Sequence, residues 1–271
     1  KPDKIVICWD GRGGSRKRKE KNPNYKEGRK PIRLNRSVKT MTQDQEMQNK
    51  VWQQYRLMEM LNYMPFIQLV SEGSEADDVI AMVSQNKKYK GWHKVIVSSD
   101  KDFFQLCDEE TVLYRPIQKV FMNKPRILNE FGIHPTNFAM ARAIAGDKSD
   151  NLEGVRGVGL KTISKKMEFF AQEKSVTFKD LFDFCENDNT GLKAFSSILE
   201  CQDTIQDNYK IMQLYSPSIS IQVKTKIQYA LDNFEAEFNK TEIMKRMQED
   251  GFGEWNTSDI FATCKRITSK A

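Results

Sequence analysis

Residues 94–102, KVIVSSDKD, decide the fold class of this chain of 271 residues. The run begins with β-branched apolar residues, which is typical of a buried strand in a parallel sheet, and it ends in two aspartates. Similar apolar runs that predict strands occur at Lys4–Cys8, Phe66–Val70 and Thr111–Tyr114. Because helix-forming segments alternate with these runs, the sequence predicts an α/β fold with a mostly parallel central sheet flanked by helices.

Residues 42–64 hold good helix formers and predict an amphipathic helix. Its apolar positions are Met47, Val51, Tyr55 and Met58. Ser74 is expected to cap the next helix, with Asp77 in the third position of a capping box. After about residue 124 the pattern is helical, with a glycine turn at 154–159 and one further strand-like run, Ser218–Val223, before the last helices.

Composition excludes several classes of protein. Apolar residues make up 39% of the chain and charged residues 30%, which is typical of a soluble globular protein. No run approaches the roughly 20 apolar residues that span a bilayer, and no signal peptide is visible, so we expect a cytoplasmic protein with no membrane contact. The five cysteines form no CxxC pair, which argues against structural zinc and against a disulfide framework. The only histidines, His93 and His134, are not spaced as metal ligands.

Basic charge is concentrated in one segment. Residues 12–39 hold twelve Lys and Arg against two acidic residues, a net charge of +10, whereas the whole chain is +6 and the rest is therefore −4. A block of like charge is typical of a mobile element or of one that binds a polyanion, and nucleic acid is the obvious polyanion. We interpret residues 11–40 as a mobile loop or a loosely helical insertion.

Acidic residues gather at four places, each at the end of a predicted strand or at the start of a helix. They are Asp10, then Glu75 with Asp77 and Asp78, then Asp100 with Asp102, and then Asp147 with Asp150. The carboxyl ends of parallel strands meet at one crevice, so we expect these side chains to converge there. So many carboxylates need a positive counter-charge. Because the potential ligands are all oxygen atoms, hard cations such as Mg²⁺ or Mn²⁺ fit this site. Two such ions about 3.5–4 Å apart could bind a scissile phosphate.

Each acidic group also has a plain structural interpretation. An isolated Asp-x-Asp is common in solvated turns, and an acidic helix start is commonly only a cap and a partner of the helix dipole. Asp147 and Asp150 are also suited to cap the junction of a helix and a loop. The joint placement of all four groups favours the shared metal site.

Residues 154–162, GVRGVGLKT, have the form of a helix–hairpin–helix turn. Glycines let backbone N–H groups approach closely and point outward, so the turn predicts a phosphate-binding nest before a helix N-terminus. The residues expected to contact a nucleic-acid backbone are Gly154, Gly157, Gly159, Lys161, Thr162 and Lys165. The alternative interpretation is an ordinary glycine-rich turn.

Three residues of the basic segment are candidates for direct contact with nucleic acid. Lys26 and Arg29 lie about one helical turn apart, so both reach one phosphate if the segment becomes helical on binding, and they would stabilise charge in the transition state. Tyr25 is placed to stack on a base. The alternative is a solvated basic loop.

Together these motifs resemble the 5′ nuclease superfamily, which includes flap endonucleases, the 5′ nuclease domain of bacterial DNA polymerase I and phage 5′–3′ exonuclease/RNase H enzymes. The matching motifs come in family order over roughly residues 4–170. They are Asp10 after a strand, YKxxR at 25–29, EADD at 75–78, SDKDF at 99–103 and GDKSDN at 146–151 before the glycine turn. The compact size is most similar to that of phage members.

The resemblance implies a PIN-like nuclease domain over 1–135 with a basic arch over 11–45, and a helix–three-turn–helix domain over 136–205 that grips DNA. Residues 206–271 are expected to pack back on the nuclease domain. By the same resemblance, the first metal is held by Asp10, Glu75, Asp77 and Asp100, with Asp78 supporting them, and the second is served by Asp102, Asp147 and Asp150. Lys26 and Arg29 match arch residues beside the scissile phosphate, and the glycine turn is expected to hold K⁺ through backbone carbonyls.

The implied activity is that of a structure-specific 5′ nuclease that hydrolyses phosphodiester bonds in replication or repair and leaves a 5′-phosphate and a 3′-hydroxyl. The implied substrates are 5′ flaps, nicked or branched duplex DNA and RNA–DNA hybrids, and replication proteins are candidate partners. We expect a monomer in the cytoplasm of a phage-infected bacterial host.

Two features depart from the family pattern. The family has an earlier strand with its first metal-binding aspartate, and this strand is expected to be missing before Lys1. Family prolines in the turn are replaced by Glu153, Arg156 and Leu160. The missing ligand leaves an alternative open, namely a module that binds branched or duplex DNA but cleaves it poorly. A Ca²⁺-binding protein is disfavoured because the sequence has no EF-hand loop.

Overall fold

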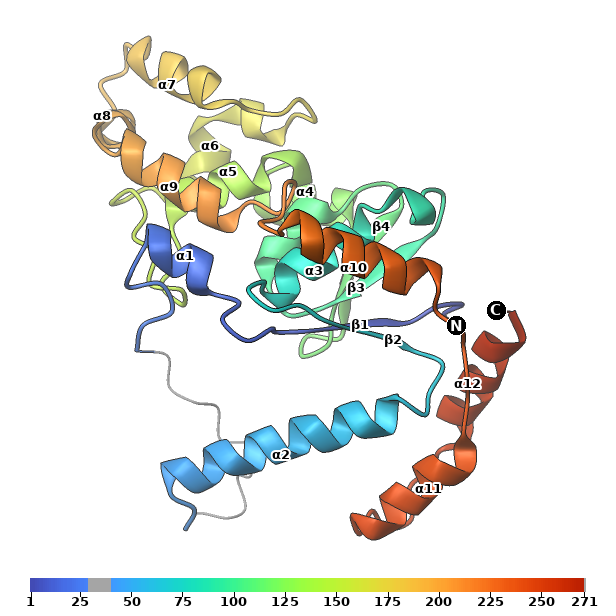
Figure 1. The fold of residues 1–271 in the computed structure, drawn as a ribbon. Helices are drawn as coiled ribbons and strands as arrows, with labels where there is room; N and C mark the ends of the chain where they lie inside the picture. The colour runs from blue at the N-terminus through green and yellow to red at the C-terminus, as the bar shows by residue number, and fades with distance from the viewer. Residues whose placement is uncertain (29–39, 271) are drawn as a thin grey trace. The chain divides into compact units, whose positions relative to one another are not determined.

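The strands predicted for the first half of the chain are present in the computed structural model, which describes residues 1–28 and 40–270 (Figure 1). Their bounds are β1 Val6–Trp9, β2 Ile67–Val70, β3 Lys94–Val97 and β4 Thr111–Arg115. A further strand, β5 Val120–Met122, is not signalled by the sequence, because three residues are too few to show a period.

The α/β class is confirmed, and the described strands form two small sheets. Strands β1 and β2 form a parallel pair, in the register Val6↔Ile67 to Trp9↔Val70. A separate sheet has the order β3-β4-β5, in which β3 is parallel and β5 antiparallel to β4. An apolar run predicts a strand but not its neighbour, because pairing between distant segments depends on the tertiary structure.

Helices fill much of the rest of the described chain. Before β4 they are α1 Arg16–Lys21, α2 Gln43–Leu61 and α3 Ala76–Ser84. After β5 they are α4 Lys124–Phe131, α5 Pro135–Ala145, α6 Leu160–Lys166, α7 Phe178–Glu186, α8 Lys193–Glu200, α9 Gln202–Met212, α10 Ile221–Asp232, α11 Lys240–Glu249 and α12 Ser258–Lys270. Short 3₁₀ helices lie at Lys87–Tyr89, Lys101–Leu106 and Glu168–Ala171. Within residues 1–28 and 40–270, no helix has the length and apolar character needed to cross a membrane.

Two local predictions are wrong. The predicted strand Ser218–Val223 instead leads into α10, where the Ser220 hydroxyl accepts the Val223 N–H at 3.3 Å and caps the helix. The residue that precedes α3 is Glu75, not Ser74, and its side chain makes no cap. The Glu75 carboxylate instead faces cationic side chains, as described below.

The described residues divide into two units. The small unit consists of the described parts of Lys1–Gly11, Arg29–Glu72 and Ser220–Ala271. The large unit consists of Arg12–Gly28 and Gly73–Ile219. The domain bounds predicted from the sequence differ from this division and stay a prediction.

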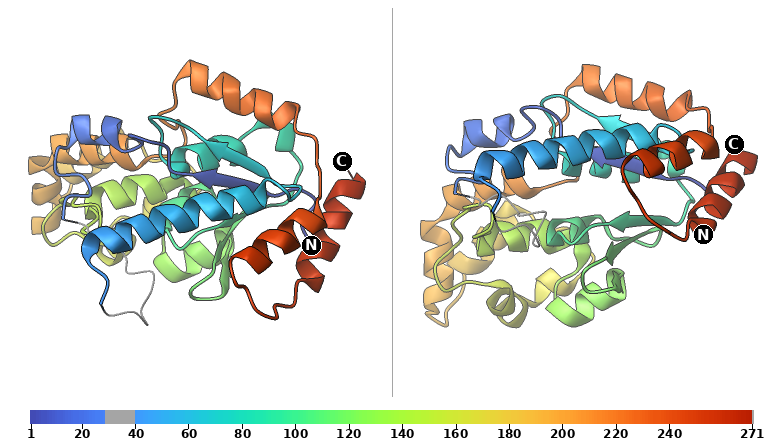
Figure 2. Two further views of the ribbon diagram at one scale, coloured as in Figure 1. Left: turned by 60° about the horizontal axis from the view of Figure 1, so that its bottom comes forward. Right: turned by 90° about the horizontal axis from the view of Figure 1, so that it is seen from below.

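In the small unit, α2 packs against α11 and α12 (Figure 2). Met60 of α2 lies in an apolar cluster with Ile243, Met247 and Phe261. Beside this cluster, Arg56 of α2 donates to the Asp250 carboxylate at 2.8 Å. Apolar burial and a half-buried ion pair therefore hold the end of α2 against the C-terminal helices.

The apolar face predicted for α2 is mostly exposed. The exposed fractions of Met47, Val51 and Tyr55 are 55%, 60% and 69%, whereas Met60 and Leu61 at the end of the helix are buried. Helical periodicity shows which residues share a face, but it does not show whether another element covers that face.

In the large unit, α5 is the central helix. It packs against the 3₁₀ helix Lys101–Leu106 and against α9, and the Phe104 and Phe138 rings meet edge to face at 5.1 Å. Phe138 and Ile144 are fully buried. This packing fixes the segment that follows β3 relative to the loop that follows α5, and both segments hold predicted site residues.

Candidate active site

Carboxylates from three segments of the large unit lie close together. The segments are the start of α3 with Glu75, Asp77 and Asp78, the end of β3 with Asp100 and Asp102, and the loop after α5 with Asp147. Asp77 is repelled by Asp100 and Glu75, and Asp102 is repelled by Asp100 and Asp147. Asp100 therefore acts on both halves of the acidic cluster, of which one holds Glu75, Asp77 and Asp78 and the other holds Asp102 and Asp147.

A short turn fixes the two aspartates after β3. Asp100 caps the 3₁₀ helix Lys101–Leu106, because its carboxylate accepts the Asp102 N–H at 2.9 Å. The Ser98 hydroxyl in turn accepts the Asp100 N–H at 3.1 Å. The order of residues in SSDKD thus determines this geometry locally.

Asp77 is the carboxylate whose acidity is most affected by the cluster. Burial raises the pKa of Asp77 to about 7, and the negative charges of Asp100 and Glu75 add to this effect. Lys26 and Arg18 oppose it only in part. The surroundings of Asp77 therefore have less positive than negative charge.

Glu75 is buried, with an exposed fraction of 4%, and three side chains from the basic segment surround its carboxylate. Lys26 Nζ donates to Oε1 at 2.9 Å, the Tyr25 hydroxyl donates to Oε2 at 3.3 Å, and Arg18 Nη1 lies 3.1 Å from Oε2. The basic segment is therefore directly part of the acidic site.

Arg18 is a site residue that the sequence analysis missed. Its guanidinium binds both oxygens of Asp78, at 2.7 and 3.2 Å, and its Nε donates to the Ile211 carbonyl of α9 at 3.1 Å. Asp78 also accepts the Ser218 N–H at 3.1 Å. Nothing in the run RKRKEK distinguishes Arg18 from its neighbours, because only the fold turns this one side chain inward.

We expect Arg18→Met to lower the free energy of unfolding by roughly 3–5 kcal/mol, because it leaves the Asp78 charge buried without its partner. Urea denaturation followed by circular dichroism measures this change. Arg16→Met is the matched control in the same helix, because the Arg16 side chain is 80% exposed and its ion pair with Glu20 contributes little. If the two substitutions lowered the free energy of unfolding equally, the buried pair of Arg18 and Asp78 would stabilise the protein no more than an exposed ion pair.

Arg142 of α5 is the second site residue that the sequence analysis missed. Its Nε donates to Asp102 Oδ1 at 2.9 Å, and its Nη2 forms an ion pair with Asp147 Oδ2. Burial nevertheless raises the pKa of Asp102 to about 6. The pKa of Asp147 is lowered, because hydrogen bonds from Ser149 and Arg142 outweigh the effect of burial. A lone arginine in the apolar stretch FAMARAIA is the signal that marks Arg142.

The turn at residues 22–28 packs on the loop that contains Asp150. The Lys26 N–H donates to the Asp150 carbonyl at 3.0 Å, and Asn151 donates to the Asn24 carbonyl at 3.0 Å. Lys26 adopts a left-handed conformation with φ of 56°. Arg29 itself lies outside the described residues.

The predicted role of Tyr25 in stacking on a base does not fit its surroundings. Its exposed fraction is 3%, and its ring lies in a small apolar cluster with Leu152, Ile211 and Met212. Burial and the charges of Glu75 and Asp150 raise the pKa of Tyr25, so its hydroxyl remains a hydrogen-bond donor. Tyr25 anchors the basic segment to the acidic cluster.

Asp10 is exposed and follows β1 in the small unit, and its contribution to the site stays a prediction. Asp3 of the same unit pairs with Arg266 at 2.6 Å and with Lys270 at 2.8 Å, so it serves the packing of α12.

The donors of the large unit fit a hard divalent cation by their chemistry. They are carboxylate oxygens, and burial together with the negative charges of Asp100 and Glu75 raises the pKa of Asp77 to about 7. Within residues 1–28 and 40–270, however, no three potential ligand side chains already surround one point in metal-binding geometry. Several carboxylates have cationic partners in this arrangement, so a bound ion must share or replace those contacts.

The glycine turn is built by close backbone approach at one end and is open at the other. A Cβ on Gly154 would lie 2.1 Å from the Ala145 carbonyl oxygen, so this position requires glycine. Gly157, with φ of 79°, and Gly159, which precedes α6, are exposed. Lys161 and Lys165 are exposed on α6, and Thr162 is half-buried. The exposed residues are accessible to a nucleic-acid backbone, and their role stays a prediction.

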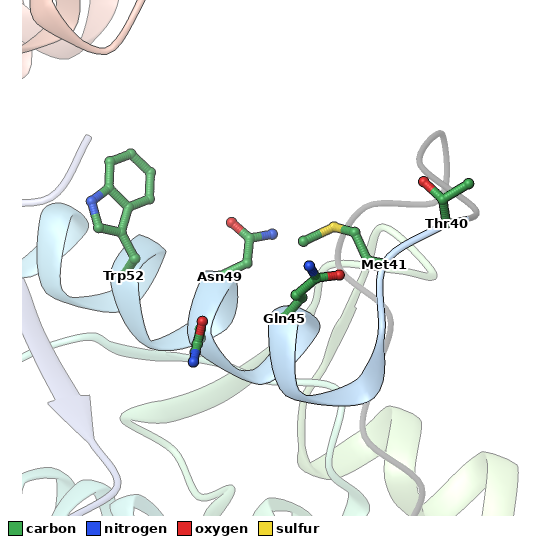
Figure 3. Close-up of a pocket in the computed structure, with 6 residues that line it drawn as sticks. Thr40, Met41, Gln45, Asn49 and Trp52 are labelled. Carbon is green, nitrogen blue, oxygen red and sulfur yellow. The ribbon is translucent and has the colours of Figure 1, made fainter.

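A shallow pocket of about 580 Å³ lies on the first part of α2 in the small unit (Figure 3). Its lining consists of Thr40, Met41, Gln45, Gln48, Asn49 and Trp52. These side chains include no carboxylate and no other titratable group, so the pocket does not have the chemistry of the acidic cluster.

Comparison with known proteins gives consistent matches. Residues 1–132 match the family model described as the 5′-3′ exonuclease, N-terminal resolvase-like domain. A 5′-3′ exonuclease of Aquifex aeolicus (strain VF5) is 40% identical over 90 residues, which are 33% of this chain and 31% of that protein. Flap endonuclease Xni of Shewanella sp. (strain MR-4) is 29% identical over 213 residues, which are 79% of this chain and 73% of that protein. A solved structure of T5 5′-exonuclease with bound divalent metal ions (zinc) has a TM-score of 0.62 and 17% identity, and the match covers 91% of this chain and 82% of that chain.

Proposed function

The chain belongs to the 5′ nuclease superfamily, and from this premise we propose that it hydrolyses phosphodiester bonds near 5′ ends of DNA as a divalent-metal-dependent exonuclease and flap endonuclease. One observation supports the proposal above all others. Carboxylates of three separate segments, at Glu75 to Asp78, at Asp100 to Asp102 and at Asp147, lie together in the large unit beside the Lys26 ammonium group.

The proposed ligands of a first divalent ion, Mg²⁺ or Mn²⁺, are Glu75, Asp77 and Asp100, with Asp78 supporting them. Those of a second ion are Asp102, Asp147 and Asp150. When bound, such ions supply a Lewis acid that activates water and stabilises the leaving oxygen. The protein's own part is to hold these oxygens close together, so that the mutual repulsion of the carboxylates favours the binding of cations.

Lys26 is proposed to stabilise negative charge on the phosphate during cleavage. Its ammonium group is held at Glu75 by a 2.9 Å contact, while its side chain remains 24% exposed. A cation beside the acidic cluster is positioned to attract a phosphate that the carboxylates alone repel. We propose the same role for Arg29, whose position the structure does not describe.

The glycine turn and α6 are proposed to hold the duplex part of the substrate. Exposed backbone at Gly157 and Gly159 and the ammonium groups of Lys161 and Lys165 suit contacts with phosphates and not with base edges. A K⁺ ion bound to carbonyls of this turn is part of the same proposal.

We expect the double variant Lys161→Ala/Lys165→Ala to bind flap DNA more weakly, and its affinity to depend less on salt. Each lost phosphate contact should reduce the slope of log K against log salt concentration by about 0.9. Fluorescence anisotropy at several salt concentrations measures both changes. Lys179→Ala, an exposed lysine of α7, is the control and should keep the slope of the unmodified protein. An unchanged slope in the double variant would remove α6 from the interface.

The finer features of the function are proposals as well. We propose that the substrates are 5′ flaps and nicked or branched duplexes, that RNA–DNA hybrids of primers are also cut, and that the products have a 5′-phosphate and a 3′-hydroxyl. These substrates place the protein in replication or repair, in contact with replication proteins.

A second candidate function is a module that binds branched DNA and cleaves it poorly. It is favoured by the observation that Arg18, Lys26 and Arg142 already form ion pairs with four carboxylates of the acidic cluster, namely Glu75, Asp78, Asp102 and Asp147. One experiment separates the two functions, namely incubation of the full chain with a labelled 5′-flap substrate and Mg²⁺, with EDTA in a parallel reaction. Cleavage that stops with EDTA and returns with Mg²⁺ supports the nuclease, whereas salt-sensitive binding without cleavage supports the module.

A further inference from the structure

Arg142 joins two carboxylates that come from different parts of the chain. Asp102 belongs to the turn after β3 and Asp147 to the loop after α5, and Arg142 contacts both of them through Nε and Nη2. The exposed fractions of the three side chains are 14% for Arg142, 21% for Asp102 and 17% for Asp147. The ion triad is thus largely shielded from water, so its electrostatic interactions are stronger than those of a surface pair.

The position of Arg142 is strongly constrained. Its neighbours Ala141 and Ala143 on α5 are fully buried, so the helix holds the start of the side chain in place. The guanidinium also donates to the Gly146 carbonyl at 3.4 Å. A guanidinium keeps its charge at every pH at which the protein is folded, so the triad always contains this cation.

Asp147 has little capacity left for another ligand. Its Oδ1 accepts both the N–H and the hydroxyl of Ser149 at 2.7 Å, and its Oδ2 is paired with Arg142. In the other half of the cluster, Glu75 is paired with Lys26 and Arg18, and Asp78 is paired with Arg18. Asp77 and Asp100, in contrast, have no ion pair with any side chain in residues 1–28 and 40–270. The pair Asp102 and Asp147 therefore shares a cation at contact distance, whereas the pair Asp77 and Asp100 does not.

We propose that Arg142 is a built-in counter-charge that holds Asp102 and Asp147 together and lowers the affinity of this pair for a divalent cation relative to the half with Asp77 and Asp100. The inference rests on the proposed function. Arg142 is a positioning residue in this scheme. A metal ion that binds to Asp102 or Asp147 is repelled by the Arg142 guanidinium at contact distance, unless it displaces the guanidinium from the carboxylate. The two ions of the proposed site therefore bind with unequal affinity.

The test is a titration of the full chain with Mn²⁺, followed by electron paramagnetic resonance and by calorimetry without DNA. The unmodified protein is expected to bind one ion tightly and a second more weakly. Arg142→Gln should tighten the second ion by at least about tenfold, since the repulsion is removed while both carboxylates remain. Arg142→Lys keeps a cation and should stay close to the unmodified protein. Arg126→Gln removes an exposed arginine of α4 and is the matched control for the change in net charge.

Asp102→Asn assigns the weak ion, because it should abolish the second binding event both alone and in the Arg142→Gln background. Arg142→Gln should also lower the Mg²⁺ concentration that gives half-maximal cleavage. The inference is overturned if Arg142→Gln leaves the second ion unchanged or weakens it, or if Arg142→Lys tightens the ion as much as glutamine does. If the inference about Arg142 is overturned but cleavage still depends on metal, the proposed function is unaffected. If the unmodified protein binds no Mn²⁺ at all, both the inference and the proposed function are overturned.

Discussion

Asp100→Asn is expected to reduce the single-turnover rate of flap cleavage by roughly 10³-fold or more, because it removes a carboxylate whose charge acts on both Asp77 and Asp102. Asparagine keeps a side-chain oxygen that accepts the Asp102 N–H, so the cap of the 3₁₀ helix is preserved. The loss should therefore come from the missing charge and not from unfolding. Rates measured with excess enzyme at saturating Mg²⁺, together with circular dichroism of the variant, check the expectation.

Asp183→Ala is the matched control for Asp100→Asn, because Asp183 is an exposed residue of α7 in the same unit. It should cut at the rate of the unmodified protein. If Asp100→Asn cut at that rate too, the acidic cluster of the large unit would not be the catalytic site. Activity restored by a large excess of Mn²⁺ would instead show that Asp100 acts through metal affinity.

Lys26→Met is expected to slow the chemical step by roughly 10²-fold while the dissociation constant for flap DNA changes by no more than about threefold. Methionine keeps the length of the side chain but removes the ammonium group that lies 2.9 Å from Glu75. The positive charge of Lys26 stabilises the phosphate most when negative charge develops on it during cleavage. Its loss should therefore lower the rate of cleavage more than the affinity for DNA. Single-turnover kinetics and anisotropy titrations separate the two quantities.

Lys21→Ala is the control for Lys26→Met within the same basic segment. Lys21 is exposed at the end of α1, so it should change neither the rate nor the salt dependence by much. Equal effects of the two substitutions would mean that the segment acts only through its total charge. An unchanged rate for Lys26→Met would remove Lys26 from the mechanism.

Local sequence determined the features that depend on neighbouring residues. The apolar runs before Asp10 and Asp100 form strands β1 and β3, and SSDKD forms the turn that fixes Asp100 beside Asp102. The glycine at 154 is required by a backbone contact, and the order of motifs was sufficient to predict the family. These features follow from steric limits and hydrogen bonds within a few residues, which a sequence shows directly.

Only the tertiary structure decided which charges meet. Arg18 and Arg142 turn inward to Asp78, Asp102 and Asp147, whereas Arg16, two residues from Arg18, stays in solvent. Tyr25 is buried against Glu75 instead of being free to stack, and the apolar residues of α2 that the periodicity groups together are left uncovered. Each of these outcomes depends on what a distant segment places opposite a side chain. Charge pairing and burial are properties of the space around a residue, so a pattern along the chain shows which residues can act and only the fold shows with which partner they act.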